Sequence, residues 1–210
     1  MKMYYSTKIA EKLLDYKNEI KYVLDVGGGV GLFAEYITQH IEDCHVAMVE
    51  YNEKTEWDQL DKTRITIIKQ NILDLDFDQE FDVVWASHVL EHMPNANHFL
   101  KLLKSALKPN GFLAITVPPL KHRIVGGHIS LWNAGLLLYN LVLAGFDCSE
   151  AKILKYEGNI SILLRKKEIE LPLLKFGQDD LTTLQPYLPI KVDPQHFFEG
   201  DIEELNWNTI

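Results

Sequence analysis

A cluster of glycines constrains the fold most strongly, because four of the five residues at positions 27–31 are glycine. The short apolar run at residues 22–26 predicts a buried parallel strand before the cluster, and residues 32–41 predict a helix after it. Glycine permits positive φ and a close approach of backbone to a ligand, and the helix start adds unpaired N–H groups. This unit predicts a site for a nucleotide-like ligand. A simple tight turn is the alternative, although a turn needs fewer glycines.

The rest of the chain alternates strand and helix patterns. Further strands are predicted at residues 45–50, 65–69, 81–87 and 112–117, and helices at residues 8–20, 97–107 and 131–144. Residues 151–156 and 160–165 flank Glu157-Gly158-Asn159 and predict a closing hairpin. We therefore expect an α/β fold with a Rossmann-like, doubly wound sheet of seven strands, mostly parallel, with one antiparallel strand from the C-terminal hairpin. Ligands of such sheets bind at the carboxyl ends of the strands.

The glycine spacing narrows the choice of ligand. The dinucleotide fingerprint needs glycines at positions one, three and six, but the sixth position from Gly27 is Leu32 and Gly31 is the fifth. NAD and FAD are therefore disfavoured, and a phosphate loop is excluded because no Gly-Lys-Ser/Thr follows. Glu50 ends the second predicted strand, where an acid accepts hydrogen bonds from ribose hydroxyls. The alternative for Glu50 is an ordinary surface acid.

Four segments in order carry a family resemblance. Residues 23–31 resemble the first signature motif of the class I S-adenosylmethionine (SAM)-dependent methyltransferases. Residues 71–75, 81–92 and 103–113 are similar to three later motifs of the same family, and the resemblance covers about residues 20 to 167. It implies SAM as the cofactor and S-adenosylhomocysteine as the product. Residues 127–146 resemble a subgroup that methylates sugars, nucleotide-linked sugars or other small metabolites.

The resemblance implies roles for individual residues. Glycines 27 and 29 would flank the methionine part of SAM, with Asp25 supporting the loop and the amino group. Glu50 would hold the ribose, Tyr51, Asn71 and Ile72 would face the adenine, and Ser87 would lie near the methionine end. The family usually has aspartate where this chain has Asn71, but an amide oxygen still accepts a hydrogen bond from the adenine amino group. The cofactor-binding residues implied are Asp25, Gly27, Gly28, Gly29, Gly31, Glu50, Tyr51, Asn71, Ile72, Ser87 and His88.

The acceptor site is expected at residues 118–133, which follow the fifth strand. His128 is the predicted general base, because O-methylation removes a hydroxyl proton and histidine titrates near neutrality; the alternative is a histidine that caps the next helix. Arg123 and Lys121 are predicted to hold an anionic group on the substrate, unless they are ordinary surface charges. His122 is a further predicted substrate-binding residue. Trp132 is predicted to stack on the substrate, with burial under the helix as the alternative. No metal site is expected, since neither cysteine (Cys44, Cys148) belongs to a metal-ligand pair.

Charge divides the chain into two parts. The formal charge is −9, and residues 168–210 hold nine acids against two lysines, which gives −7 there and −2 in residues 1–167. We expect residues 1–167 to form the SAM-binding domain, and residues 168–210 to be an acidic, proline-containing extension packed on that domain or on a second subunit, as in a homodimer. The acidity argues against nucleic-acid and membrane partners. The first residues lack the apolar run of a signal peptide, which predicts a cytoplasmic protein.

Two functions follow. The first is a SAM-dependent methyltransferase that methylates oxygen on a small polar acceptor, such as a sugar or nucleotide-linked sugar of surface polysaccharide synthesis. The second is a catalytically inactive partner protein that binds SAM. A nicotinamide oxidoreductase is disfavoured by the glycine spacing.

Overall fold

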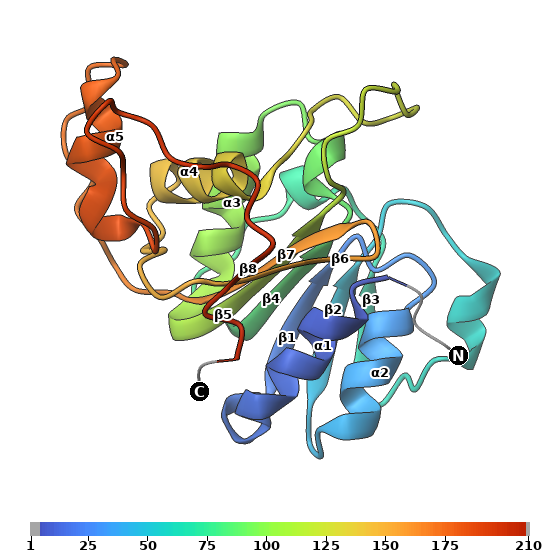
Figure 1. The fold of residues 1–210 in the computed structure, drawn as a ribbon. Coiled ribbons are helices and arrows are strands. Elements are labelled where there is room, and N and C mark those ends of the chain that lie inside the picture. The colour runs from blue at the N-terminus through green and yellow to red at the C-terminus, as the bar shows by residue number, and fades with distance from the viewer. Residues whose placement is uncertain (1–4, 209–210) are drawn as a thin grey trace.

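The structure is a computed structural model that describes residues 5–208. It contains one sheet in the order β3-β2-β1-β4-β5-β7-β6-β8 (Figure 1). The pairs from β3 through β5 are parallel, and β7 and β8 each run antiparallel to their neighbours. The strands are β1 (Tyr22–Val26), β2 (His45–Val49), β3 (Ile65–Ile68), β4 (Phe81–Ser87), β5 (Leu107–Val117), β6 (Lys152–Tyr156), β7 (Asn159–Arg165) and β8 (Glu204–Leu205).

Helices cover both faces of this sheet. Helices α1 (Thr7–Leu13) and α2 (Leu32–His40) lie on one face, and α3 (Ala96–Ala106) and α4 (Ala134–Leu143) lie on the other (Figure 1). Successive residues of a strand point to opposite faces, so Leu24 joins the core under α3 and α4 while Val23 joins the core under α1 and α2. Helix α5 (Asp179–Leu184) and the short 3-10 segments Leu14–Glu19, Thr55–Gln59, Ile72–Asp74 (η3), Leu90–His92 (η4) and Gln185–Tyr187 complete the described elements.

The predicted α/β, doubly wound fold is confirmed, and the sheet is one strand wider than expected. The tail supplies β8, which pairs with β6, so the sheet has eight strands rather than seven, and two of them are antiparallel. The helix predicted from residue 131 begins at Ala134, because Asn133 caps it: the Asn133 side-chain oxygen accepts a hydrogen bond of 2.7 Å from the backbone N–H of Leu136.

Residues of the acidic extension contribute to both cores. Leu184, Leu188 and Val192 belong to the core under α3 and α4, and Trp207 belongs to the core under α1 and α2. The extension (red) passes α4 and reaches the edge of the sheet at β6 (Figure 1). Among residues 5–208, no helix has the length and apolar character needed to cross a membrane.

The order of the strands places a crevice at β1. From β1 the sheet extends through β2 and β3 on one side and through β4 and β5 on the other. The chain segments that leave β1 and β4 therefore turn to opposite sides of the sheet. Ligands of open α/β sheets bind at such a switch point, outside the carboxyl ends of the strands.

Candidate functional site

The glycine loop between β1 and α2 is closed against protein on one side and open on the other. A Cβ at Gly28 would lie 2.2 Å from Met48 Cγ, so the loop packs too closely on β2 to admit a side chain there. A Cβ at Gly29 would meet nothing within 4 Å, although the φ of +55° strains any other residue. The open side of Gly29 faces the crevice, which leaves space for a ligand against the backbone.

Glu50 joins this loop to the end of β2. Its Oε2 accepts a hydrogen bond of 3.1 Å from the backbone N–H of Gly29, and its Oε1 accepts one of 3.0 Å from Asn52. The indole Nε1 of Trp57 donates to the carbonyl of Gly29 at 2.8 Å. Carboxylate oxygens have further lone pairs, so Glu50 retains the capacity to accept hydrogen bonds from a vicinal diol.

Asp25 is a buried carboxyl group beside the loop. It is 1% exposed, and its Oδ2 has no hydrogen-bond partner among the described residues. Burial, together with the nearby charge of Glu50, raises the pKa of Asp25 to about 7, although a hydrogen bond from the Ala34 backbone acts in the other direction. A buried acceptor without a partner is costly, and a cationic ligand group would stabilise its ionised form.

Two cavities meet at the glycine loop. The first, of about 410 Å³, is lined by Asp25, the loop, Ser87 and His128 among others. The second, of about 460 Å³, is lined by Glu50, Tyr51, Asn71 and Ile72 among others. Gly27, His88 and His92 line both cavities. Ten of the eleven residues predicted to bind the cofactor therefore line these two cavities. The exception is Gly31, which packs against Leu60.

A third cavity, of about 460 Å³, lies away from the glycine loop, at the opposite end of the sheet. It is lined by Tyr16, Phe112 and Arg165 among others. Two of its cations are already paired: Arg165 contacts Glu19 at 2.8 Å, and Lys167 contacts Glu150 at 2.5 Å. The carboxyl ends of the strands, where the glycine loop lies, are therefore the better candidate site.

Asn71 uses its side chain to start a 3-10 turn. Its Oδ1 accepts a hydrogen bond of 3.0 Å from Leu73 N–H, and η3 follows directly. This contact occupies one lone pair of the oxygen, which retains a second one. Ile72, the first residue of η3, is buried and lines the second cavity with an apolar surface.

His88 occupies a strained position at the end of β4. Its φ is +56°, its Nε2 lies 2.8 Å from Asn159 Oδ1, and its Nδ1 lies 3.3 Å from Glu91 Oε1. Burial alone would lower the pKa of His88, but the contacts with Glu91 and Asn159 outweigh it and raise that pKa. The imidazole ring therefore carries positive charge between the two cavities more readily than an ordinary histidine does.

The loop from Pro118 to Asn133, called the substrate loop below, places the predicted acceptor residues in different surroundings. His128 lines the first cavity. It does not cap α4, since Asn133 does. Arg123 lines a small cavity next to His128, and His122 is exposed and does not line the two main cavities.

The prediction that Trp132 contacts the substrate is wrong. It is 3% exposed and belongs to the core under α3 and α4, and its Nε1 donates to Ser130 Oγ at 2.9 Å. The ring is covered by protein, which matches the alternative of burial under the helix. A large aromatic side chain next to a helix start satisfies both its apolar area and its N–H group in this position.

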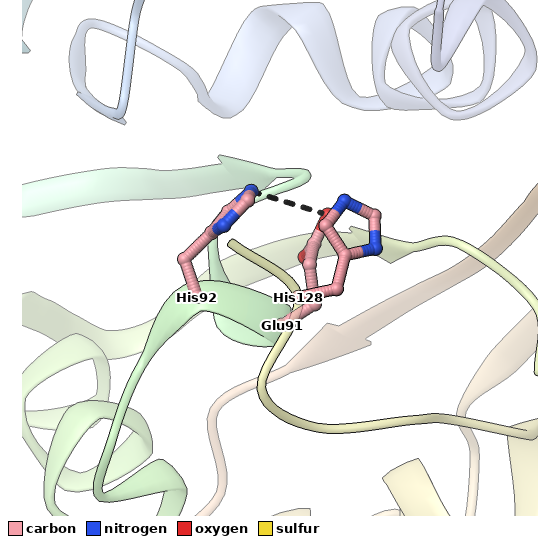
Figure 2. Close-up of side chains that lie close together, drawn as sticks. All are labelled: Glu91, His92 and His128. Carbon is pink, nitrogen blue, oxygen red and sulfur yellow. Dashed lines mark ion pairs between the residues drawn. The ribbon is translucent and has the colours of Figure 1, made fainter. Parts of the chain in front are cut away.

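Two residues at the site are missing from the predicted cofactor-binding and substrate-binding sets. Glu91 is completely buried beneath the first cavity, and His92, which lines both cavities, donates from Nδ1 to the carbonyl of Gly127 at 2.8 Å. The His92 and His128 rings meet edge to face, with centroids 4.9 Å apart (Figure 2). Glu91 and His92 follow a predicted strand in the sequence. Only the fold shows that the substrate loop lies over them.

Comparisons with known protein sequences agree with this geometry. The family model described as a methyltransferase domain matches residues 2–151. The chain is 31% identical over 113 residues to the ubiquinone biosynthesis O-methyltransferase of Rickettsia bellii, and this match covers 51% of this chain and 47% of that protein. It is 28% identical over 100 residues to the (S)-tetrahydroprotoberberine N-methyltransferase of Eschscholzia californica, which covers 44% of this chain and 28% of that protein. The matches thus span about half the length of these curated relatives, or less.

Solved structures share the fold. The 1,6-didemethyltoxoflavin-N1-methyltransferase of Burkholderia thailandensis, solved with bound 1,6-didemethyltoxoflavin and S-adenosylhomocysteine, superposes with a TM-score of 0.64 at 19% identity and covers 77% of this chain and 78% of its own. Human N-acetylserotonin methyltransferase in complex with SAM superposes with a TM-score of 0.59 at 16% identity and covers 76% of this chain and 52% of its own.

Proposed function

The chain belongs to the class I SAM-dependent methyltransferases, and on this premise we propose that it transfers a methyl group from SAM to an oxygen atom of a small polar acceptor. The observation that carries this proposal is the pair of cavities joined at the glycine loop, one beside the buried carboxyl of Asp25 and the other beside Glu50. SAM, when bound, supplies an electrophilic methyl group on a sulfonium sulfur, which keeps the bonding electron pair as the methyl group leaves.

The residues of the two cavities suit the parts of the cofactor. The Asp25 carboxyl would pair with the ammonium group of SAM, which would supply the partner that Oδ2 lacks. Glu50 would accept hydrogen bonds from the ribose hydroxyls, and it keeps the loop in place through Gly29. Ile72 offers apolar surface and Asn71 a polar edge to the adenine. These assignments follow the chemistry of each side chain and the cavity it lines.

The acceptor binds, in this proposal, on the His128 side of the first cavity. A new O–CH3 bond forms with an oxygen lone pair, and the hydroxyl proton must leave as this bond forms. We assign His128 to that proton removal because it reaches the cavity from the substrate loop, opposite the glycine loop. A sugar or nucleotide-linked sugar remains our proposed acceptor class. The name of the Rickettsia bellii relative adds intermediates of ubiquinone biosynthesis as acceptors to test.

Turnover is the direct test of this function. We expect the purified protein to bind SAM with a micromolar Kd in calorimetry and to release S-adenosylhomocysteine when the correct acceptor is added from a panel of sugars, nucleotide sugars and other hydroxylated compounds. The Gly29→Arg variant should lose both, because its side chain would project into the open space at Gly29. The unfolding temperature of the variant shows whether it folds. We expect a loss of stability of only about 1–2 kcal/mol, from strain at positive φ. Cofactor binding without turnover on any acceptor would instead favour the inactive partner.

Glu50→Gln tests the ribose assignment. The amide keeps one acceptor oxygen but replaces the other with a donor, so one of the two contacts to Gly29 and Asn52 is lost together with the negative charge. We expect SAM affinity to fall about tenfold or more, since hydrogen bonds to charged groups contribute about 1.5–3 kcal/mol. Glu53→Gln is the matched control, because the exposed Glu53 pairs with Lys69 outside the cavities. Equal affinity in both variants, measured by calorimetry, would remove Glu50 from the cofactor site.

A further inference from the structure

Two loops bring three potential metal ligands together beside the first cavity. Glu91 and His92 come from η4 and His128 comes from the substrate loop (Figure 2). One donor atom from each residue lies within 4.8 Å of the other two. Donors that bind one ion at about 2.1 Å lie about 3 to 4.2 Å apart, so a side-chain shift of less than about 1 Å would complete the set. We propose that Glu91, His92 and His128 bind a divalent transition-metal ion.

Glu91 supplies the strongest reason for this proposal. Its side chain is completely buried, and neither carboxylate oxygen forms a hydrogen bond among the described residues. The nearest basic atoms are His88 Nδ1 and His92 Nε2, at 3.3 and 3.9 Å from Oε1. Glu91 is thus a buried carboxylate that histidine rings approach on one oxygen but that accepts no hydrogen bond within 3.5 Å with good geometry. Desolvating such a charge is costly, whereas a bound cation would stabilise it.

The hydrogen bonding of His92 also supports a metal site. Its Nδ1 lies 2.8 Å from the carbonyl oxygen of Gly127, which only accepts hydrogen bonds, so Nδ1 carries the proton. Nε2 lies on the side of the Glu91 carboxylate, 3.9 Å from Oε1 and beyond hydrogen-bond distance. An unprotonated Nε2 would point its lone pair at the carboxylate, and a cation bound between the two would remove their repulsion. A hydrogen bond from the remote nitrogen to a carbonyl is also the contact that orients metal-binding histidines.

His88 does not replace the ion. Its Nε2 donates to Asn159 Oδ1, because the Asn159 amide nitrogen donates to the Tyr156 carbonyl at 3.2 Å and fixes the orientation of the amide. Its Nδ1 lies 3.3 Å from Glu91 Oε1. We therefore place His88 outside the ligand set, as a neighbour that orients the carboxylate.

Backbone contacts hold the third ligand over the other two. The N–H groups of Ile129 and Ser130 donate to the Glu91 carbonyl at 2.9 and 3.3 Å. The substrate loop is therefore attached to η4 on both sides of the cluster, through Gly127 before His128 and through Ile129 after it. A site built from two segments in this way is positioned by the fold before any ion binds.

The donor set defines the ion and its chemistry. Two imidazoles and one carboxylate suit Zn²⁺ and related first-row ions, and they leave coordination positions for a substrate. The cluster lies at the first cavity, so an acceptor hydroxyl could bind the ion there. A bound ion would lower the pKa of a coordinated hydroxyl, so that its proton could pass to water. With the ion bound, His128 would be a ligand, so this inference replaces the general-base role that the proposed function gives to His128.

Metal binding to the protein alone tests the proposal, without SAM or acceptor, so its outcome does not depend on the proposed methyl transfer. Protein without an affinity tag is stripped with EDTA and dialysed against Zn²⁺, and bound zinc is measured by elemental analysis. We expect one ion per chain with a micromolar Kd or tighter. His92→Ala and His128→Ala should each weaken binding by about a hundredfold, because each removes one of three ligands. Co²⁺ in place of Zn²⁺ should give visible absorption bands that both variants lose.

Control variants keep the test decisive. His122→Ala removes an exposed imidazole from the same loop and should bind Zn²⁺ like the wild type. Glu91→Gln is the isosteric variant for the buried ligand, and its unfolding temperature in EDTA shows whether it folds. Absence of zinc binding in the wild type, or binding unchanged by both histidine variants, would overturn the proposal.

Discussion

The Asp25→Asn variant should unfold at a higher temperature than the wild type when both are free of ligand at about pH 8. The pKa of Asp25 is raised from 3.8 to about 7 by burial and by Glu50, so the folded protein disfavours the ionised form. The folded state therefore holds a proton that the unfolded state releases between these two pKa values, and stability falls as the pH rises through that window. About 1.4 kcal/mol per unit of pKa sets an upper limit of roughly 4 kcal/mol.

We expect a gain of about 1–3 kcal/mol, because the amide keeps an oxygen for the Ala34 backbone but adds a buried NH2 group. Thermal unfolding between about pH 4 and pH 8 measures it, and the difference between variant and wild type should vanish at the acid end. Asp82→Asn is the contrasting control: Asp82 Oδ2 accepts from the backbone of Lys21 and Tyr22, and Oδ1 pairs with Lys108 at 2.7 Å. That substitution should destabilise the protein. A lower unfolding temperature for Asp25→Asn at the alkaline end would contradict the expectation.

Cofactor affinity should change in the opposite direction. An ammonium group binds the ionised form of Asp25, so SAM affinity in the wild type should fall by up to about tenfold per unit as the pH drops below about 7. Asp25→Asn should bind SAM at least about tenfold more weakly at the alkaline end and should lose most of this pH dependence. Calorimetry across the pH range measures both effects. A variant that gains stability but binds SAM like the wild type would show that Asp25 is strained for a reason unrelated to the cofactor.

Local chemistry explains which parts of the site were predictable. The glycine loop and Glu50 each follow a strand, so their place at the carboxyl edge of a parallel sheet can be inferred from residue type and order alone. The substrate loop has no such periodicity. His128 turned toward the first cavity, His122 toward solvent and Trp132 into the core, and only the packing of the loop on η4 distinguishes these outcomes.

The Glu91 cluster lay outside prediction for a related reason. Glu91 and His92 are adjacent in the sequence, but nothing there links them to His128, which comes from a loop that follows another strand. The eighth strand is only two residues long, Glu204–Leu205, which is too short to show an alternating pattern. Long-range contacts therefore decided both features, and short-range patterns decided the rest of the sheet.

Leu184→Ala should be the most destabilising single substitution in the acidic extension. Leu184 is completely buried in the core under α3 and α4, although it belongs to the short helix α5. Truncating a buried leucine costs about 2–5 kcal/mol, through the lost transfer energy and the cavity that remains. Chemical denaturation with urea measures the loss. Leu173→Ala is the matched control, because Leu173 lies in the same extension and is 91% exposed.

The comparison separates two roles for residues 168–210. If the extension stabilises the domain of its own chain, Leu184→Ala weakens the protein at every protein concentration, and deleting the extension also removes β8, Leu188, Val192 and Trp207 from the sheet and the two cores. Burial of each such side chain contributes about 1.5–3 kcal/mol, so the deletion should remove most of the 5–15 kcal/mol typical of a folded protein. If the extension instead served only a second subunit, Leu184→Ala would leave unfolding of the monomer unchanged, and Leu173→Ala would shift the dimer equilibrium measured by sedimentation.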